Sequence, residues 1–329
     1  MLLVLLLITG CATTSPAAPT PVTLPPTPTS RPVTPMPAEP SRRFRIVGYV
    51  TDLDAIISQV RFDQLTHVNY AFLLPNADGS ITGVANSWKL KDLVAKAHAS
   101  DVKVLISVGG WGWDEQFEVL ASQPETRSRF VRELDAFAEA YNLDGVDIDW
   151  EYPGPEAASA QNFVALMTEL DTVLHGKGKL LTAAVVASGS TGDSVLPDVF
   201  DRVDFLNIMA YDGPGTHHSS YAYAGDALNY WRARGLRAGK TVLGVPFYAR
   251  PIDMPYRKLV QANPDAANVD EIDYFGRKAY YNGIPTIQRK TELAMRQASG
   301  IMIWNLAHDT NDASSLLSAI YRTAYGDVR

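Results

Sequence analysis

The stretch that decides the fold is Asp144-Gly145-Val146-Asp147-Ile148-Asp149-Trp150-Glu151. Side chains on a β-strand alternate between its two faces, so Asp147, Asp149 and Glu151 share one face of this segment. The apolar side chains between them share the other face. In a barrel, one face of a strand meets the surrounding helices and the other points into the interior. Buried carboxylates require pairing or a shared proton, so the pattern predicts a catalytic cluster, with a calcium or magnesium site as the alternative.

Short apolar runs of the same kind occur on both sides of this segment. Together they predict eight strands at 44–50, 65–72, 103–108, 145–151, 180–187, 205–211, 241–247 and 300–306. Amphipathic patterns lie between them, and the one after the fourth strand places apolar residues at Phe163, Leu166, Met167, Leu170 and Leu174. Alternating strands and helices of this number predict an α/β fold, a single (β/α)₈ TIM barrel. The alternative, a doubly wound open sheet, lacks support because no glycine-rich phosphate turn follows the first strand.

The span between the seventh and eighth strands runs from Arg250 to Gly300. From Thr286 onward it has the pattern of the seventh barrel helix, with Leu293 and Met295 expected to face inward. The remainder leaves space for at most a short insertion between strands 7 and 8. A shallow groove on this side of the barrel would follow.

The N-terminal region differs in composition from the rest. An apolar run from Leu2 to Ile8 leads to Cys11 and resembles a bacterial lipoprotein signal, although no Lys or Arg precedes it. The run is too short to span a bilayer, and a cleaved signal or a short buried helix are the alternatives. We expect 1–11 to be a signal peptide, 12–41 a disordered Pro/Thr-rich linker and 42–329 a catalytic barrel. The protein would then be secreted and anchored by lipid to the cell envelope, on its extracellular or periplasmic face.

Charge and cysteine content exclude several classes of partner and site. The formal net charge of −7 gives no support for binding nucleic acid, or for binding membrane other than through the lipid. The single cysteine excludes an intramolecular disulfide and a multi-cysteine metal site. The adjacent His217 and His218 have no further ligands at zinc spacing. We therefore expect no metal, no cofactor and a monomer.

Four motifs, each at the end of an expected strand, resemble glycoside hydrolase family 18, the chitinases and related endo-β-N-acetylglucosaminidases. The family signature Asp-x-x-Asp-x-Asp-x-Glu is matched by Asp144, Asp147, Asp149 and Glu151. The other three motifs follow the family order and are Ser107-Val108-Gly109-Gly110, Met209-Ala210-Tyr211-Asp212 and Trp304. The resemblance covers about residues 44 to 322.

The resemblance implies a retaining, substrate-assisted mechanism. Glu151 would protonate the glycosidic oxygen while the 2-acetamido oxygen of the substrate attacks the anomeric carbon, and Glu151 would then act as base for water. Asp149 would orient the acetamide and stabilise its positive charge, and Asp147 would share a proton with Asp149. Tyr211 would donate a hydrogen bond to the acetamido oxygen.

The same resemblance suggests the residues that support these groups or contact sugar. Trp304 would form the floor under the reacting sugar, with core packing as the alternative for it and for Trp111 and Trp113. Arg250 would bind sugar hydroxyls or pair with a carboxylate. Asp144 is interpreted as structural. The full substrate-binding set is Asp212, Trp304, Trp111, Tyr49, Ser107, Phe72 and Arg250.

The expected activity is hydrolysis of β-1,4-linked N-acetylglucosamine polymers, chitin or chitooligosaccharides. N-glycan cores and peptidoglycan-type glycans carry the same acetamido group and are alternative substrates. A non-catalytic chitin-binding lectin is the alternative from another class, although such proteins typically lack the acidic glutamate that Glu151 provides.

The lipoprotein hypothesis predicts a cysteine-dependent location. Wild-type protein expressed in a bacterium should partition into the detergent phase because a lipidated Cys11 anchors it. Cys11→Ser should leave the protein in the aqueous phase or unprocessed. Equal membrane association of both forms would exclude a lipid on this residue.

Overall fold

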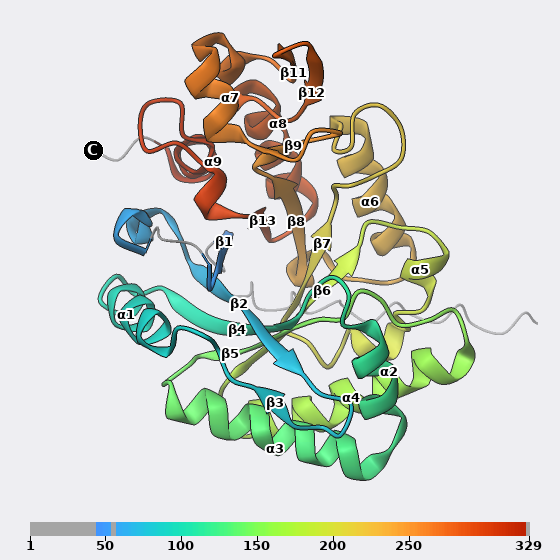
Figure 1. The fold of residues 1–329 in the computed structure, drawn as a ribbon. Helices are drawn as coiled ribbons and strands as arrows, with labels where there is room; N and C mark the ends of the chain where they lie inside the picture. The colour runs from blue at the N-terminus through green and yellow to red at the C-terminus, as the bar shows by residue number, and fades with distance from the viewer. Residues whose placement is uncertain (1–43, 54–56, 327–329) are drawn as a thin grey trace, which may run out of the picture. The chain divides into compact units, whose positions relative to one another are not determined.

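The structure is a computed structural model that describes residues 44–53 and 57–326 (Figure 1). Cys11, the expected signal peptide and the expected linker lie outside the described residues. None of the described helices is both long enough and apolar enough to cross a membrane.

Eight parallel strands form a closed barrel. They are β1 (Arg45–Thr51), β2 (His67–Pro75), β4 (Lys103–Gly109), β5 (Gly145–Asp149), β6 (Leu180–Val186), β7 (Phe205–Met209), β8 (Thr241–Pro246) and β13 (Gly300–Trp304). Each pairs with its neighbour, and β1 closes the barrel by pairing with both β2 and β13. Each begins within two residues of its predicted start, so the (β/α)₈ prediction is confirmed. A short β3 (Ile81–Thr82) adds an antiparallel edge to β2.

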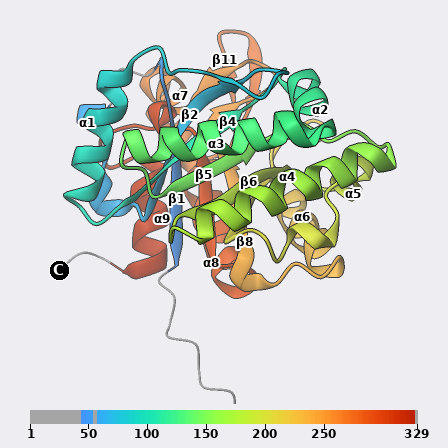
Figure 2. The ribbon, with the colours of Figure 1, turned by 90° about the horizontal axis from the view of Figure 1, so that it is seen from below.

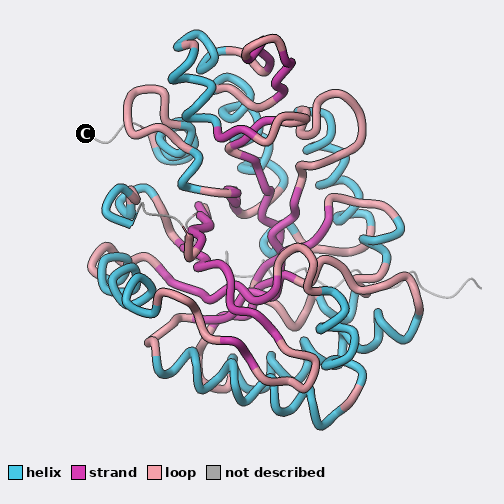
Figure 3. The backbone as a smooth tube through the Cα atoms, in the orientation of Figure 1, coloured by secondary structure: helices cyan, strands magenta, loops and turns pink. Residues whose placement is uncertain are grey.

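Helices surround the strands, as Figures 2 and 3 show. They are α1 (Ser87–His98), α2 (Asp114–Ser122), α3 (Pro124–Ala140), α4 (Ala157–His175), α5 (Ser190–Asp193), α6 (Tyr221–Ala233), α7 (Tyr256–Ala262), α8 (Ile284–Gln297) and α9 (Leu316–Tyr325). The stripe predicted for α4 is buried throughout, from Phe163 to Leu174. This packing fixes β5, which precedes α4 and carries the acidic motif, against the helical layer.

The barrel contains two separate apolar regions. The larger lies between strands and helices, whereas a smaller cluster fills the interior with Val47, Tyr49, Ala71, Ala184, Phe205, Met209, Val242 and Met302. Asp147 is fully buried and Asp149 is 3% exposed. As the alternation of side chains predicts, both belong to the inward face of β5.

The segment between β8 and β13 is a short insertion followed by α8, as predicted. The insertion contains β9 (Tyr248–Ala249), β10 (Met254–Pro255), α7, β11 (Glu271–Tyr274) and β12 (Arg277–Tyr280). Leu293 of α8 is buried as expected, but Met295 is 46% exposed, so its predicted inward orientation is wrong. Two residues along an α-helix turn the side chain by about 200°, which places Met295 on the opposite face from Leu293.

The core of α4 gives a stability prediction. Leu170 is fully buried, whereas Leu53 is 89% exposed. Leu170→Ala should therefore lower the free energy of unfolding by about 2–5 kcal/mol, because it removes buried methyl groups and leaves a cavity. Leu53→Ala should change it by less than about 0.5 kcal/mol. Denaturant unfolding checks both, and equal effects would contradict the described packing.

Candidate active site

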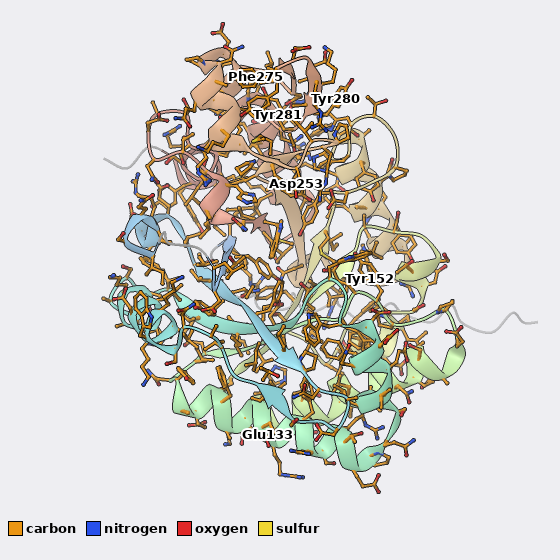
Figure 4. All side chains as sticks on the ribbon, viewed as in Figure 1. Glu133, Tyr152, Asp253, Phe275, Tyr280 and Tyr281 are labelled. Atoms are coloured by element: carbon orange, nitrogen blue, oxygen red, sulfur yellow. The ribbon has the colours of Figure 1, made fainter. Side chains whose placement is uncertain are left out.

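A cavity of about 890 Å³ lies where the barrel strands end at their carboxyl termini. Figure 4 labels two of its lining residues, Tyr152 and Asp253. The expected site residues that line it are Tyr49, Phe72, Trp111, Asp149, Glu151, Tyr211, Asp212, Arg250 and Trp304. Asp147 and Ser107 are also expected members, and they lie buried in the barrel interior. The structure thus brings the predicted catalytic and substrate-binding residues together in this cavity and in the barrel interior next to it.

Asp147 is the most fully bonded carboxyl group of the site. Its Oδ2 accepts hydrogen bonds from the Tyr49 hydroxyl at 2.6 Å and the Ser107 hydroxyl at 2.8 Å. Its Oδ1 accepts from the Thr182 hydroxyl at 2.5 Å and from the Asn207 amide at 3.2 Å. Burial raises the pKa of Asp147, and these four hydrogen bonds oppose the rise. Four donors occupy the acceptor positions of both oxygens, so they stabilise the ionised form.

Sequence reasoning missed Thr182 and Asn207. Each is a polar residue within an apolar run, at an inward position of β6 or β7. Strand alternation alone could have indicated that their side chains point into the barrel. That signal would not have given their partner, because the pairing depends on the register between strands.

Asp149 differs from Asp147 in its surroundings. The pKa of Asp149 is raised well above its usual value. Burial is the largest cause, followed by the charge of Glu151 and then by that of Asp147. Its Oδ1 has no hydrogen-bond partner among the described residues. The expected sharing of a proton between Asp147 and Asp149 has no matching hydrogen bond in the described part of the chain, because Asp147 is occupied by its four donors. Burial and the two neighbouring carboxyl groups therefore favour the protonated form of Asp149.

Glu151 lies just beyond the strand and not within it as expected, because β5 ends at Asp149. Burial raises the pKa of Glu151, the Tyr152 hydroxyl opposes this rise, and the charge of Asp212 adds to it. A half-buried carboxyl group with a raised pKa can hold a proton and donate it to a ligand in the cavity. Tyr152 was missed from the sequence although it directly follows the acidic motif.

The Tyr211 hydroxyl is available as a donor. Burial is the main cause that raises its pKa well above 10, and the neighbouring Tyr248 and the carboxyl groups of Asp149 and Glu151 add to the effect. The phenol therefore stays protonated. Its one described hydrogen-bond contact is with the Met302 sulfur at 3.9 Å, a weak acceptor that a ligand oxygen would replace.

Asp212 is held in an ion-pair cluster on the cavity wall. Arg250 donates to both of its oxygens, at 2.9 and 3.2 Å, and the Tyr248 hydroxyl donates at 2.8 Å. Burial by itself would raise the pKa of Asp212, but hydrogen bonds from His218, Arg250 and Tyr248 outweigh it and lower the pKa. Arg250 also pairs with Asp253 at 2.9 Å. Of the two roles weighed for Arg250, the structure shows carboxylate pairing at a position that also lines the cavity.

Aromatic rings form the apolar part of the wall. Trp304 stacks on Phe72 with ring centroids 5.7 Å apart and meets the edge of Tyr49 at 5.4 Å. Trp111 is 80% exposed and lines the cavity together with Trp113, so core packing does not describe Trp111. Such surfaces suit the apolar faces of a pyranose ring.

Two other sequence features lie outside the cavity lining. Asp144 accepts hydrogen bonds from His98 at 2.8 Å and Lys103 at 2.9 Å, at the start of β5. His217 lies 2.7 Å from the carbonyl oxygen of Tyr281. Within residues 44–53 and 57–326 no group of three or more His, Cys, Asp or Glu residues could hold a metal ion.

Comparison with known proteins agrees with this geometry. The model of the family described as glycosyl hydrolases family 18 matches residues 45–309. Chitinase 1 of Aphanocladium album is 30% identical over 240 residues, which cover 57% of this chain and 55% of that protein. The chain thus spans about half the length of this curated relative.

Two solved structures show the same fold. The GH18 chitinase ChiB from the chitin utilization locus of Flavobacterium johnsoniae has a TM-score of 0.75 and 30% identity, over 86% of this chain and 94% of that one. A chitinase from Bacteroides thetaiotaomicron has a TM-score of 0.77 and 26% identity, over 87% and 97%.

The electrostatics of the site predict how Glu151 titrates. Asp212→Asn removes a negative charge that disfavours ionisation of Glu151 and leaves Arg250 with one fewer anion, so the pKa of Glu151 should fall. Side-chain ¹³C NMR of labelled glutamate measures this. Asp253→Asn, which removes the other partner of Arg250, is the control and should shift Glu151 less. A higher Glu151 pKa in Asp212→Asn would refute the assigned cause.

Proposed function

The chain belongs to glycosyl hydrolases family 18, and we propose that it hydrolyses β-1,4-linked N-acetylglucosamine polymers, chitin or chitooligosaccharides, with retention of anomeric configuration. One observation carries the proposal. Glu151 and Asp149, both with raised pKa values, line one cavity together with the Tyr211 donor. The named chitinases among its relatives support chitin as the substrate class.

Glu151 is the general acid in this mechanism. Its raised pKa favours the protonated form, which transfers its proton to the glycosidic oxygen as the bond breaks. The acetamido oxygen of the substrate attacks the anomeric carbon and forms an oxazolinium ion, because no enzymic nucleophile is required when the substrate supplies one at high effective concentration. Glu151, now ionised, takes a proton from the water that opens this ion, and the configuration is retained.

The groups below the sugar position and stabilise the acetamide. The Oδ1 atom of Asp149, which has no partner among the described residues, accepts a hydrogen bond from the N–H group of the acetamide. The Tyr211 hydroxyl donates a hydrogen bond to the acetamide oxygen. Positive charge that develops on the ring is stabilised by the fixed anion of Asp147 beneath. The Trp304 ring, supported from behind by Phe72, carries the apolar face of the reacting sugar.

We also propose a monomer that is held at the cell envelope by a lipid on Cys11. The apolar run from Leu2 to Ile8 that leads to this cysteine and the Pro/Thr-rich stretch after it support that location.

Glu151→Gln tests the assigned acid. The amide keeps the shape of the side chain but cannot transfer the proton, so kcat on a chromogenic chitotriose glycoside should fall by about 10²–10⁴-fold. Affinity for chitin oligomers should persist because the aromatic wall is unchanged. The control is Glu133→Gln on the exposed face of α3, away from the cavity in Figure 4, which should keep wild-type kcat.

The substrate provides the second arm of the same test. A matched glycoside without the 2-acetamido group should not be turned over, because the nucleophile is missing. Comparable hydrolysis of both glycosides, or wild-type kcat in Glu151→Gln, would refute the proposal.

A further inference from the structure

Lys290 of α8 is fully buried although it carries an ionisable amine. Its Nζ donates to the carbonyl oxygen of Ser219 at 2.7 Å, to the hydroxyl of Ser219 at 2.8 Å and to the side-chain oxygen of Asn282 at 2.6 Å. All three of these acceptors are neutral groups, and none is a carboxylate. Burying a cation among neutral acceptors costs free energy of desolvation, so packing alone does not explain why a lysine lies here.

The three bonds of Lys290 reach the active site through Ser219. The Ser219 hydroxyl donates to the carbonyl oxygen of Ala210 at 2.7 Å, and Ala210 directly precedes Tyr211. The Asn282 amide donates to the Ser219 carbonyl oxygen at 2.8 Å. We call segment 210–219 the Tyr211 loop. The hydrogen bond from the Ser219 hydroxyl to the Ala210 carbonyl oxygen joins its first and last residues, and Lys290 donates to that same hydroxyl.

The elements around this contact bring three parts of the chain together. α8 packs against α6, which follows the Tyr211 loop, and both helices contact β8. Asn282 is the last part of the insertion before α8. The amine thus connects a barrel helix, the insertion and a loop that lines the cavity.

We propose that Lys290 is a positioning residue, which acts through the Ser219 hydroxyl to hold Tyr211 where it donates to the substrate acetamide. This inference rests on the proposed function, since it assigns Lys290 to the same reaction. The Ser219 hydroxyl has one hydrogen, which it donates to the carbonyl oxygen of Ala210, while its oxygen accepts a hydrogen bond from Lys290. The bond from Lys290 fixes the position of the oxygen and leaves the hydrogen directed at Ala210.

The charged form of Lys290 is the one that fits. An ammonium group has three N–H donors, and three acceptors surround it, whereas a neutral amine has two donors and one lone pair. Burial lowers the pKa of Lys290 to about 7, and the charge of Asp270 opposes this. His217 is the other titratable group that interacts with it. On the acid side of neutrality the ammonium form therefore prevails and all three bonds are made.

A double-mutant cycle on the acid side of neutrality tests the proposal. Lys290→Met should lower kcat on a chitotriose glycoside by about 10-fold in the wild-type background, with KM changed by less than about threefold. In a Tyr211→Phe background the same change should lower kcat by less than about twofold, because the hydroxyl that Lys290 positions is absent. An equal loss in both backgrounds would overturn the proposal, since a purely structural role does not depend on Tyr211.

Two further variants make the test secure. Ser219→Ala removes the connecting hydroxyl but leaves Lys290 its other two acceptors, so it should reproduce the dependence on Tyr211 even if Lys290→Met does not fold. Lys240→Met is the matched control. Lys240 also donates to three oxygen atoms, all of them backbone carbonyls, but it directly precedes β8 and so lies at the end of the barrel opposite the cavity. Its substitution should leave kcat unchanged in both backgrounds.

Hydrogen exchange separates this inference from the proposed function. If wild-type protein turns over no chitooligosaccharide, the proposed function has failed. The effect of Lys290 and Ser219 on the Tyr211 loop is then measured by amide exchange in peptides that cover 210–219. Exchange should be faster in Lys290→Met and Ser219→Ala than in Lys240→Met. Exchange at the wild-type rate in both Lys290→Met and Ser219→Ala would overturn the proposal that Lys290 holds the Tyr211 loop through Ser219.

Discussion

The carboxylate of Asp147 lies in the barrel interior with hydrogen-bond donors on all sides, and these donors come from four different strands. Tyr49 belongs to β1, Ser107 to β4, Thr182 to β6 and Asn207 to β7. Leaving a buried carboxylate without partners costs several kcal/mol, so its presence there requires every one of these strands to keep its register. The register places Asp147 directly beside Ser107 on one neighbouring strand and Thr182 on the other. Barrel closure and site chemistry therefore depend on the same contacts.

From this fully hydrogen-bonded carboxyl group the environment changes step by step towards the carboxyl ends of the barrel strands. Asp149 lies two residues further along the inward face, without a comparable set of donors among the described residues, and its burial is the main cause that favours its neutral form. Glu151 lies past the strand end, where the cavity opens to a ligand. Three carboxyl groups in one short segment thus differ in protonation because they differ in burial and in hydrogen-bond donors.

The sequence was sufficient for features that depend on local period. Eight apolar runs and the alternation within 144–151 predicted the strands and the inward face of the acids. It was not sufficient where partners come from distant parts of the chain. The bonds of Asp147 with Thr182 and Asn207 depend on register across the barrel. The pairing of Arg250 with Asp212 depends on how the insertion leaves β8. Lys290 shows the same limit, because a helical lysine is expected at the surface until the fold buries it.

The claim tested most directly is that the two aspartates of β5 differ in charge in the free protein. Carboxyl ¹³C NMR of aspartate-labelled protein near neutral pH, assigned with Asp147→Asn and Asp149→Asn, measures it. The account predicts that the signal lost in Asp149→Asn has the chemical shift of a protonated carboxyl group, and that the signal lost in Asp147→Asn has that of an ionised one. An ionised Asp149 beside a protonated Asp147 would contradict it.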